Sequence, residues 1–288
     1  MNEVTPTINF LDALVSHALP HERPMTPNEV IAHLSKGTGY YVNVDPFQIE
    51  GYKIYEVVKS KEIPGALRAQ ASQIIGPFVK EGFSAETMSG EKFVAYAFAD
   101  GNFIVTYIVV GSAHTILSVA GRIVAEISIG PDRITMMNLN GAFVVKPQQN
   151  ARLYRRLNDE VLHRFHPHYV CTSTMNPRVI SAATSSLEQN GYEVTVAEPD
   201  KPLSQWHQGV FTVLFSGRFL EPPLPDEYGV RRKQFPGLQE EAALRTLWQD
   251  AEKYPQLKRP LALKQAGLFT PVEGDQLFII GVKDIQEK

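Results

Sequence analysis

Hydrophobic and polar positions recur with two different periods along residues 141–192, and this pattern predicts four elements in succession. Pro147 ends a short apolar strand, and the polar residues after it lead into a helix. The four predicted elements are a strand at 143–145, a helix with apolar positions Leu153, Leu157 and Val161, a strand at 169–174, and a helix from 176 to 191. The segment therefore reads as a β-α-β-α unit with a polar turn at which a ligand could bind.

The residues before this unit read mainly as antiparallel strands. Two turn signals, Asp100-Gly101-Asn102 and Gly130-Pro131-Asp132, separate apolar stretches and favour hairpins. Nearer the N-terminus, Thr26 and Glu29 form a capping-box pattern around Pro27, which predicts the start of a helix. The predicted strands are residues 52–58, 92–99, 103–110, 115–119, 122–129 and 134–139, with a helix at 66–79.

The residues after 192 are predicted to add strands to the sheet and then to form a linker. Strands are predicted at 193–197 and 210–215, and the proline-rich run 221–225 marks a linker or a surface crossing. A helix at 238–253 and a strand at 276–282 follow. We therefore expect three segments: an N-terminal helical extension at 1–50, a core domain at 51–220, and a C-terminal helix–strand extension at 221–288.

Composition is that of a folded protein without a strong charge bias. The 288 residues are 43% hydrophobic, and the formal net charge of -3 gives no overall attraction to nucleic acid or to a membrane. Cys171 is the only cysteine, which excludes an intramolecular disulfide and indicates a reducing compartment, with the cytoplasm as the default. Residues 101–121 lack charged side chains, but the turn signal at Gly111-Ser112 favours a buried hairpin over a membrane span.

Several residues of the β-α-β-α unit resemble those of a known family. Val145 and Pro147 form a Val-x-Pro step, Asn176 follows the second strand, and the pair Gly191-Tyr192 closes the second helix. This layout resembles the core of the GNAT superfamily, the acetyl-CoA-dependent N-acyltransferases, over about a fifth of the chain at motif level. The resemblance implies an α/β (mixed α+β) fold, in which helices flank a mixed, mostly antiparallel sheet with N- and C-terminal additions.

The resemblance also implies a site for acetyl-CoA or another acyl-CoA. In such a site the first strand offers backbone groups to the pantetheine arm, the turn and helix start surround the pyrophosphate, and Asn176 lies beside the arm. The positions are Phe143, Val144 and Val145 for the arm, and Gln149, Asn150, Ala151, Arg152 and Leu153 for the pyrophosphate.

The chain departs from the family pattern in this turn. The usual form is Gln/Arg-x-x-Gly-x-Gly/Ala, whose glycines let phosphates approach the backbone. Counting from Gln149, Arg152 and Tyr154 stand at the two small positions, and the family's usual tyrosine acid is replaced by Leu187. Arg152 could bind phosphate through its side chain, whereas Tyr154 could obstruct the cofactor.

Two residues are candidates for the proton transfers that amine acylation needs. Glu126 places a carboxylate within an apolar strand and is the candidate base; its alternative is an outward-facing residue of an alternating strand. Tyr192, or else Tyr154, is the candidate donor of a proton to the leaving thiolate; the alternative for both is a packing aromatic. We predict no metal site, since His163, His166 and His168 lack an acidic or cysteine partner at a recognised spacing.

The sequence supports one leading function and two alternatives. The resemblance implies an N-acyltransferase that transfers acetyl or another acyl group from acyl-CoA to a primary amine, on a small molecule or a protein, by direct attack in a ternary complex. The first alternative is an inactive GNAT-like module that contacts RNA or a protein through residues 146–168, which hold five Lys or Arg against two Asp or Glu. The second is a structural role as a homodimer formed through the C-terminal segment.

Overall fold

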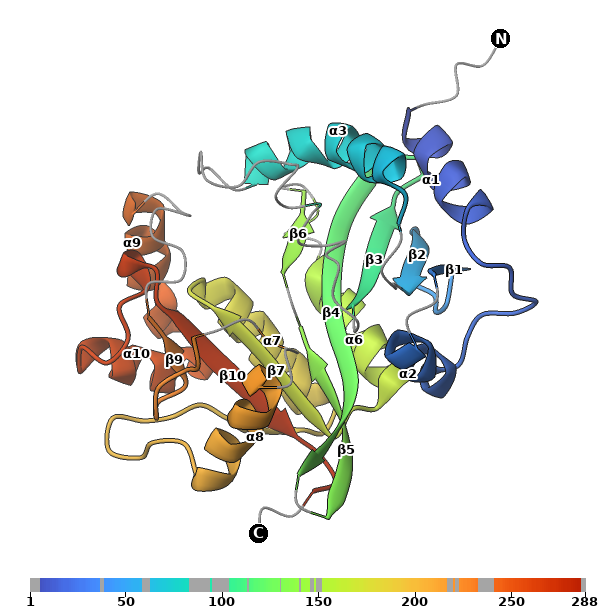
Figure 1. Ribbon diagram of the computed structural model, residues 1–288. Helices are drawn as coiled ribbons and strands as arrows, with labels where there is room; N and C mark the ends of the chain where they lie inside the picture. Colours follow the sequence, from blue (N-terminus) through green and yellow to red (C-terminus); the bar gives the residue numbers. More distant parts are fainter. Residues whose placement is uncertain are drawn as a thin grey trace. The chain divides into compact units, whose positions relative to one another are not determined.

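The protein is described by a computed structural model, in which the chain packs as two compact units (Figure 1). The N-terminal unit comprises Met1–Ala125 and Asn140–Phe165, and the C-terminal unit comprises Glu126–Leu139 and His166–Lys288. The structure describes residues 6–36, 39–58, 63–82, 94, 104–112, 114–129, 131–139, 141–145, 148, 152–216, 220, 223–232 and 241–285.

The N-terminal unit is built on an antiparallel sheet with the strand order β1-β2-β3-β4-β6. Leu14 of α1 and Ile75 of α3 pack in one buried cluster with Val57 and Ile108, so these two helices cover one face. Glu56, which alternates with Val57 along β2, instead contacts α6, which therefore lies on the opposite face. The strands are β1 Tyr41–Val44, β2 Lys53–Val58, β3 Ile104–Val110, β4 Ile116–Ile129 and β6 Ala142–Val144; the helices are α1 Pro6–Ser16, α2 Pro27–Lys36, α3 Gly65–Gly82 and α6 Leu153–Phe165.

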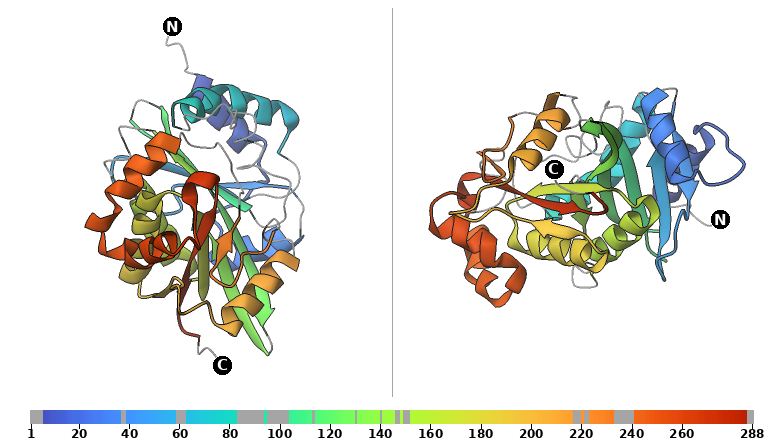
Figure 2. Two further views of the ribbon diagram at one scale, coloured as in Figure 1. Left: turned by 90° about the vertical axis from the view of Figure 1, so that its left-hand side faces the viewer. Right: turned by 90° about the horizontal axis from the view of Figure 1, so that it is seen from below.

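The C-terminal unit takes the last residues of β4 and continues the strand order as β5-β7-β10-β8. The pair β5 and β7 is parallel, whereas β10 is antiparallel to β7, β8 and β9. Leu187 of α7 lies against Gly281 on one face of β10, and Phe211 of α8 stacks on Phe278 on the other (Figure 2, right). The strands are β5 Asp132–Asn138, β7 Tyr169–Thr174, β8 Glu193–Thr195, β9 Val230–Arg231 and β10 Gln276–Val282; the helices are α7 Pro177–Gln189, α8 Gln205–Ser216, α9 Glu241–Gln249 and α10 Lys258–Gln265.

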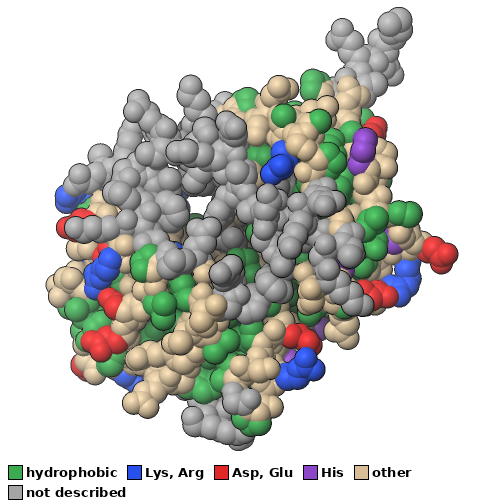
Figure 3. Space-filling model, in the orientation of Figure 1, with side chains coloured by type: hydrophobic (Ala, Val, Ile, Leu, Met, Phe, Trp, Pro, Cys, Tyr) green, Lys and Arg blue, Asp and Glu red, His purple; other side chains and the backbone are tan. Residues whose placement is uncertain are grey.

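The fold class expected from the sequence is confirmed, since helices flank a mixed, mostly antiparallel sheet. The capping box is confirmed too: the Thr26 amide donates to Glu29 Oε2 over 2.8 Å, and α2 begins at Pro27. No helix of the described residues is long and apolar enough to cross a membrane. On the face drawn in Figure 3, the coloured acidic and basic side chains lie interspersed.

Two strand predictions are wrong. Residues 210–215 lie in α8, because the buried side chains of 207, 210, 211, 214 and 215 follow the helical period despite their β-branched and aromatic types. Residues 115–119 and 122–129 belong to the single strand β4, in which Gly121 continues the ladder and pairs with Thr106. The predicted strand at 92–99 lies outside the described residues, except for Val94, which is helical.

The predicted boundary at residue 220 separates strands that the sheet joins. β10 falls in the predicted C-terminal extension, yet it pairs with β7 through Ile280 and Cys171 and with β8 through Gly281 and Val194. The C-terminal strand is therefore an inner strand of the C-terminal unit. The residues between β8 and β10, which include α8, α9 and α10, form a long connection between two strands that pair with each other.

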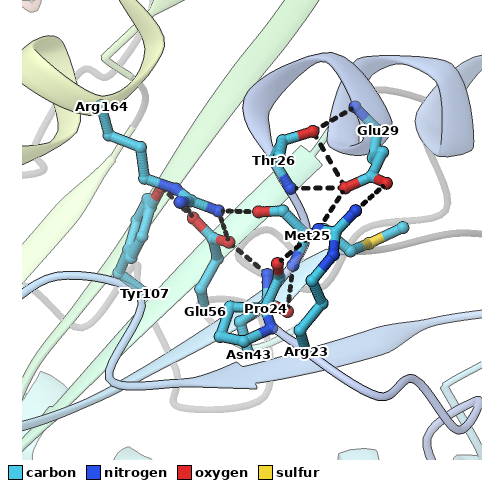
Figure 4. Close-up of polar contacts among 9 residues, drawn as sticks. All are labelled: Arg23, Pro24, Met25, Thr26, Glu29, Asn43, Glu56, Tyr107 and Arg164. Atoms are coloured by element: carbon cyan, nitrogen blue, oxygen red, sulfur yellow. Dashed lines mark hydrogen bonds and ion pairs between the residues drawn. The ribbon is translucent and has the colours of Figure 1, made fainter.

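A buried polar cluster lies between α6 and the strands of the N-terminal unit (Figure 4). The carboxylate of Glu56 is fully buried and accepts hydrogen bonds from Asn43 (2.5 Å), Tyr107 (2.7 Å) and both Nε and Nη2 of Arg164 (3.1 and 2.9 Å). Arg164 also donates to the carbonyl of Met25 over 2.6 Å. The cluster therefore ties the segment before α2 to β2, β3 and the last turn of α6.

Gly281→Ala is expected to destabilise the protein by about 1–3 kcal/mol, because an added Cβ overpacks the core. The new methyl group would lie 2.9 Å from Leu187 Cδ2 and 3.2 Å from Tyr192 Cβ. Gly209→Ala, in α8, is the matched control: nothing lies within 4 Å of its Cβ position, so the helix should gain about 0.5–1 kcal/mol. Urea unfolding of both variants measures the difference, and equal stabilities would contradict the packing of α7 on β10.

Candidate functional site

The strand pairing changes between β5 and β6, where the family resemblance places the arm of the acyl donor. β5 pairs with β7 as far as Asn138 and Cys171, and one further backbone bond runs from Leu139 to the Cys171 carbonyl (2.8 Å). In the N-terminal unit, β6 pairs instead with β4, with Phe143 opposite Val119. β4 is thus bonded to both β5 and β6, and β5 is bonded to β7 as well.

The turn that follows β6 leads into α6 through a residue with a left-handed backbone. Arg152 has φ +57°, a conformation that glycine adopts most easily, and its carbonyl accepts the first helical bond from the Arg156 amide (3.0 Å). Arg152 thus has a backbone conformation that favours glycine. It also stands at a position where the family usually has glycine. Gln149, Asn150 and Ala151, predicted to surround the pyrophosphate, lie outside the described residues.

Positive charge gathers at the start of α6. Arg152, Arg155 and Arg156 lie within its first turn or directly before it, where the helix dipole disfavours cations and favours an anion. Arg155 forms an ion pair with Asp159 at 3.9 Å, whereas Arg152 and Arg156 have no acidic partner among the described residues. The guanidinium groups of Arg152 and Arg156 therefore stand at the same helix end as the first free amides, an arrangement that suits an anion.

An aromatic side chain that the sequence did not single out supports this end of α6. The guanidinium of Arg156 lies over the ring of Tyr52, 5.6 Å from its centre, and the Tyr52 hydroxyl donates to Gln148 Oε1 over 2.8 Å. Tyr52 precedes β2 and stands 96 residues from Gln148, so no local pattern could have indicated the contact. It connects the turn before α6 to the start of the sheet.

The other predicted donor-binding residues are divided between the units. Phe143 and Val144 are buried in β6, the amide of Val145 donates to the Leu117 carbonyl (3.0 Å), and Leu153 is fully buried at the start of α6. Asn176 lies in the C-terminal unit, where its side chain caps α7 by accepting from the Arg178 amide over 2.9 Å. Tyr154, at the second small position of the family pattern, is half-buried.

The two candidate catalytic residues lie in different surroundings. The Glu126 side chain is 53% exposed and lies 4.0 Å from Arg133, as an outward-facing residue of β4. Tyr192 is buried, and its hydroxyl donates to the carbonyl of Pro167 over 2.8 Å. Burial, and secondarily the charge of Asp284, raises the pKa of Tyr192 well above its usual value, so the phenol stays protonated at neutral pH.

The histidines near the end of α6 have separate surroundings. His163 and His166 are exposed, and Nδ1 of His168 accepts a hydrogen bond from the Thr135 amide over 3.1 Å. Among the described residues, no group of three His, Cys, Asp or Glu side chains is arranged to hold a metal ion.

Tyr192→Phe is expected to cost about 1–3 kcal/mol of stability, because the buried Pro167 carbonyl loses its donor. Tyr228→Phe is a suitable control, since its hydroxyl is half-buried and its bond to Pro199 is long, at 3.4 Å. Thermal unfolding measures both. If the two variants melt alike, the Tyr192 hydroxyl does not contribute to the packing of the C-terminal unit.

Comparison with known proteins finds likeness in structure only. No family model and no curated protein sequence matches the chain. An N-acetyltransferase from Staphylococcus aureus is 10% identical, with 51% of this chain and 85% of that one covered at a TM-score of 0.32. A GNAT-family acetyltransferase from the same species is 15% identical, with coverage of 49% and 85% and a TM-score of 0.31. An aminoglycoside N(6')-acetyltransferase from Legionella pneumophila is 14% identical, with coverage of 56% and 88% and a TM-score of 0.31. These three likenesses cover about half of this chain, at 15% identity or less.

Proposed function

We propose that the protein is an N-acyltransferase, which transfers acetyl or another acyl group from acyl-CoA to a primary amine by direct attack in a ternary complex. One observation carries the proposal: the left-handed Arg152 and the neighbouring Arg156 stand at the start of α6 without an acidic partner among the described residues. Such a combination of helix dipole, free amides and cationic side chains suits a diphosphate.

The described residues at the end of the turn, Arg152 and Leu153, suit a diphosphate. Arg152 and the amide of Leu153 would hold the pyrophosphate, together with Gln149, Asn150 and Ala151. The backbone of Phe143, Val144 and Val145 would hold the arm, with Asn176 beside it. Tyr154 must turn its ring away from the phosphates, which its half-buried position allows. When bound, acyl-CoA supplies an activated thioester.

The proposed proton transfers belong to Glu126 and Tyr192. Glu126 is exposed enough to hold a water molecule, through which it would remove a proton from the acceptor ammonium. Tyr192 keeps its proton at neutral pH and would donate it to the departing thiolate, provided that its hydroxyl turns from the Pro167 carbonyl. Glu126→Gln should therefore lower kcat more than it alters the binding of acetyl-CoA.

The experiment that tests this function measures release of the CoA thiol with a colorimetric thiol reagent. Acetyl-CoA is supplied with a panel of amines: spermidine and an aminoglycoside, the acceptors named for two matched structures, and a lysine-containing peptide. Cys171 is fully buried, and burial raises the pKa of its thiol to about 12, so the protein itself should react slowly with the reagent. Amine-dependent thiol release supports the proposal, and no release above the spontaneous rate with any amine contradicts it.

The basic end of α6 also suits a second candidate, a cofactor-free module that binds RNA. Tyr154 favours this alternative, because it occupies a position where the family usually has a small residue. Phosphate contacts by Arg152 and Arg156 would make RNA binding fall steeply as salt rises. Filter binding at two salt concentrations, with acetyl-CoA as competitor, separates the candidates: RNA binding unaffected by acetyl-CoA, in a protein without thiol release, favours the module.

A further inference from the structure

A cavity of about 310 Å³ lies in the N-terminal unit. Three elements form it: one face of α1, the start of β2, and the turn that follows β3. Each element brings an ionisable side chain to the lining, namely Asp12 from α1, Lys53 from β2 and His114 from the turn. This volume is close to the lower limit for small-molecule binding pockets, about 300 Å³.

The charged groups around this cavity do not neutralise one another. Asp12 and Lys53 line the same space, and among the ion pairs of the described residues none joins them. The ammonium of Lys53 is held over the ring of Tyr55, 5.3 Å from its centre, a contact that orients the charge and leaves its hydrogen atoms able to donate. His114 has φ +54°, a conformation that is uncommon for a residue with a side chain, and it lines the same space.

The floor of the cavity is apolar. Leu11 and Val110 are almost fully buried, with 3% and 2% of their surface exposed, and they line the space beside Tyr55. A ligand that fills it should therefore carry an anionic group for Lys53 and His114, a cationic group for Asp12, and a short apolar part between them.

We propose that this cavity binds a small zwitterion, of the class of free amino acids with a short apolar side chain. The carboxylate would lie toward Lys53 and His114, the ammonium toward Asp12, and the side chain on Leu11 and Val110. The site differs from the start of α6 by the face of the sheet: Leu11, Tyr55 and Val110 belong to the cluster that α1 and α3 cover, whereas α6 lies on the opposite face. The proposal does not depend on acyl transfer.

The test is a titration of the full chain with L-leucine, L-valine and L-methionine, followed by ligand-observed saturation-transfer NMR. L-leucine is compared with leucinamide, which lacks the carboxylate, and with N-acetyl-leucine, which lacks the ammonium. We expect saturable binding of an amino acid in the millimolar range or tighter, and at least tenfold weaker binding of both analogues. Saturating acetyl-CoA should leave this binding unchanged.

Two variants assign each ligand group to its side chain. Asp12→Asn should weaken leucine at least fivefold but leave N-acetyl-leucine unchanged, whereas Lys53→Gln should weaken leucine but leave leucinamide unchanged. Both side chains are exposed, so the fold should tolerate the changes, and Glu252→Gln in the other unit is the control. The proposal is overturned if none of the three amino acids binds saturably below about 20 mM, or if both variants bind them like the parent. Failure here would leave the thiol-release result untouched.

Discussion

Arg164→Met is expected to destabilise the protein by about 3–5 kcal/mol, which makes it the largest stability change we predict for a single side chain. The variant removes the charged partner of Glu56, whose carboxylate is fully buried and 2.9 Å from Arg164 Nη2. The bonds from Asn43 and Tyr107 would remain, but neither carries a charge that offsets the buried carboxylate. Equilibrium unfolding in urea, with circular dichroism as the readout, measures the loss.

A matched control and a second variant identify the cause of the Arg164 effect. Arg23→Met breaks another ion pair of similar length, to Glu29 at 2.7 Å, but both side chains are exposed, so the change should be close to neutral. Combining Glu56→Gln with Arg164→Met should recover part of the loss, because no unpaired charge then stays buried. If Arg164→Met is no worse than Arg23→Met, the cluster in Figure 4 does not hold the N-terminal unit together.

Arg152→Glu is expected to weaken the binding of acetyl-CoA by about 100-fold, the largest functional change among our predictions. The substitution replaces a cation by an anion beside the first free amides of α6, where the pyrophosphate is proposed to lie. A hydrogen bond to a charged group contributes about 1.5–3 kcal/mol, or roughly 10- to 150-fold in affinity. Thermal unfolding with increasing acetyl-CoA should show the midpoint rising for the parent and remaining fixed for the variant.

Two further substitutions separate charge from backbone conformation at this turn. Arg152→Gly supplies the residue that the left-handed φ of +57° favours, so only the charged hydrogen bond is lost and acetyl-CoA binding should weaken by about tenfold, less than in Arg152→Glu. Lys258→Glu makes the same change of charge at an exposed position of α10 and should not alter binding. If Lys258→Glu weakens acetyl-CoA as much as Arg152→Glu does, the effect is one of net charge and not of a site.

Local patterns in the sequence were enough to predict the elements around the turn. The helical spacing of Leu153, Leu157 and Val161 corresponds to α6, and the capping residues at 26–29 correspond to the start of α2. The predicted strand at 169–174 is β7, and Gly191 follows α7 in a left-handed conformation, at φ +80°. These features depend on neighbouring residues, so the chain needs no distant contact to indicate them.

Features that depend on distant contacts could not be predicted. β-branched and aromatic residues at 210–215 resemble a strand locally, but their packing against Phe278 of β10 decides in favour of α8. The inner position of β10 depends on pairing with β7, more than a hundred residues earlier. At the candidate site, the positions of Arg152 and Leu153 followed from the motif, whereas the role of Tyr52 follows from a contact across the sequence.

The central claim is that the start of α6 binds the pyrophosphate of an acyl-CoA, and isothermal titration of the parent protein with acetyl-CoA tests it most directly. We predict saturable binding of one molecule per chain, tighter than about 100 µM at low salt and weakened as salt screens the arginines. Pantetheine, which lacks the phosphates, should bind far more weakly. The claim is contradicted if acetyl-CoA gives no heat of binding up to about 1 mM, or if pantetheine binds as tightly as acetyl-CoA.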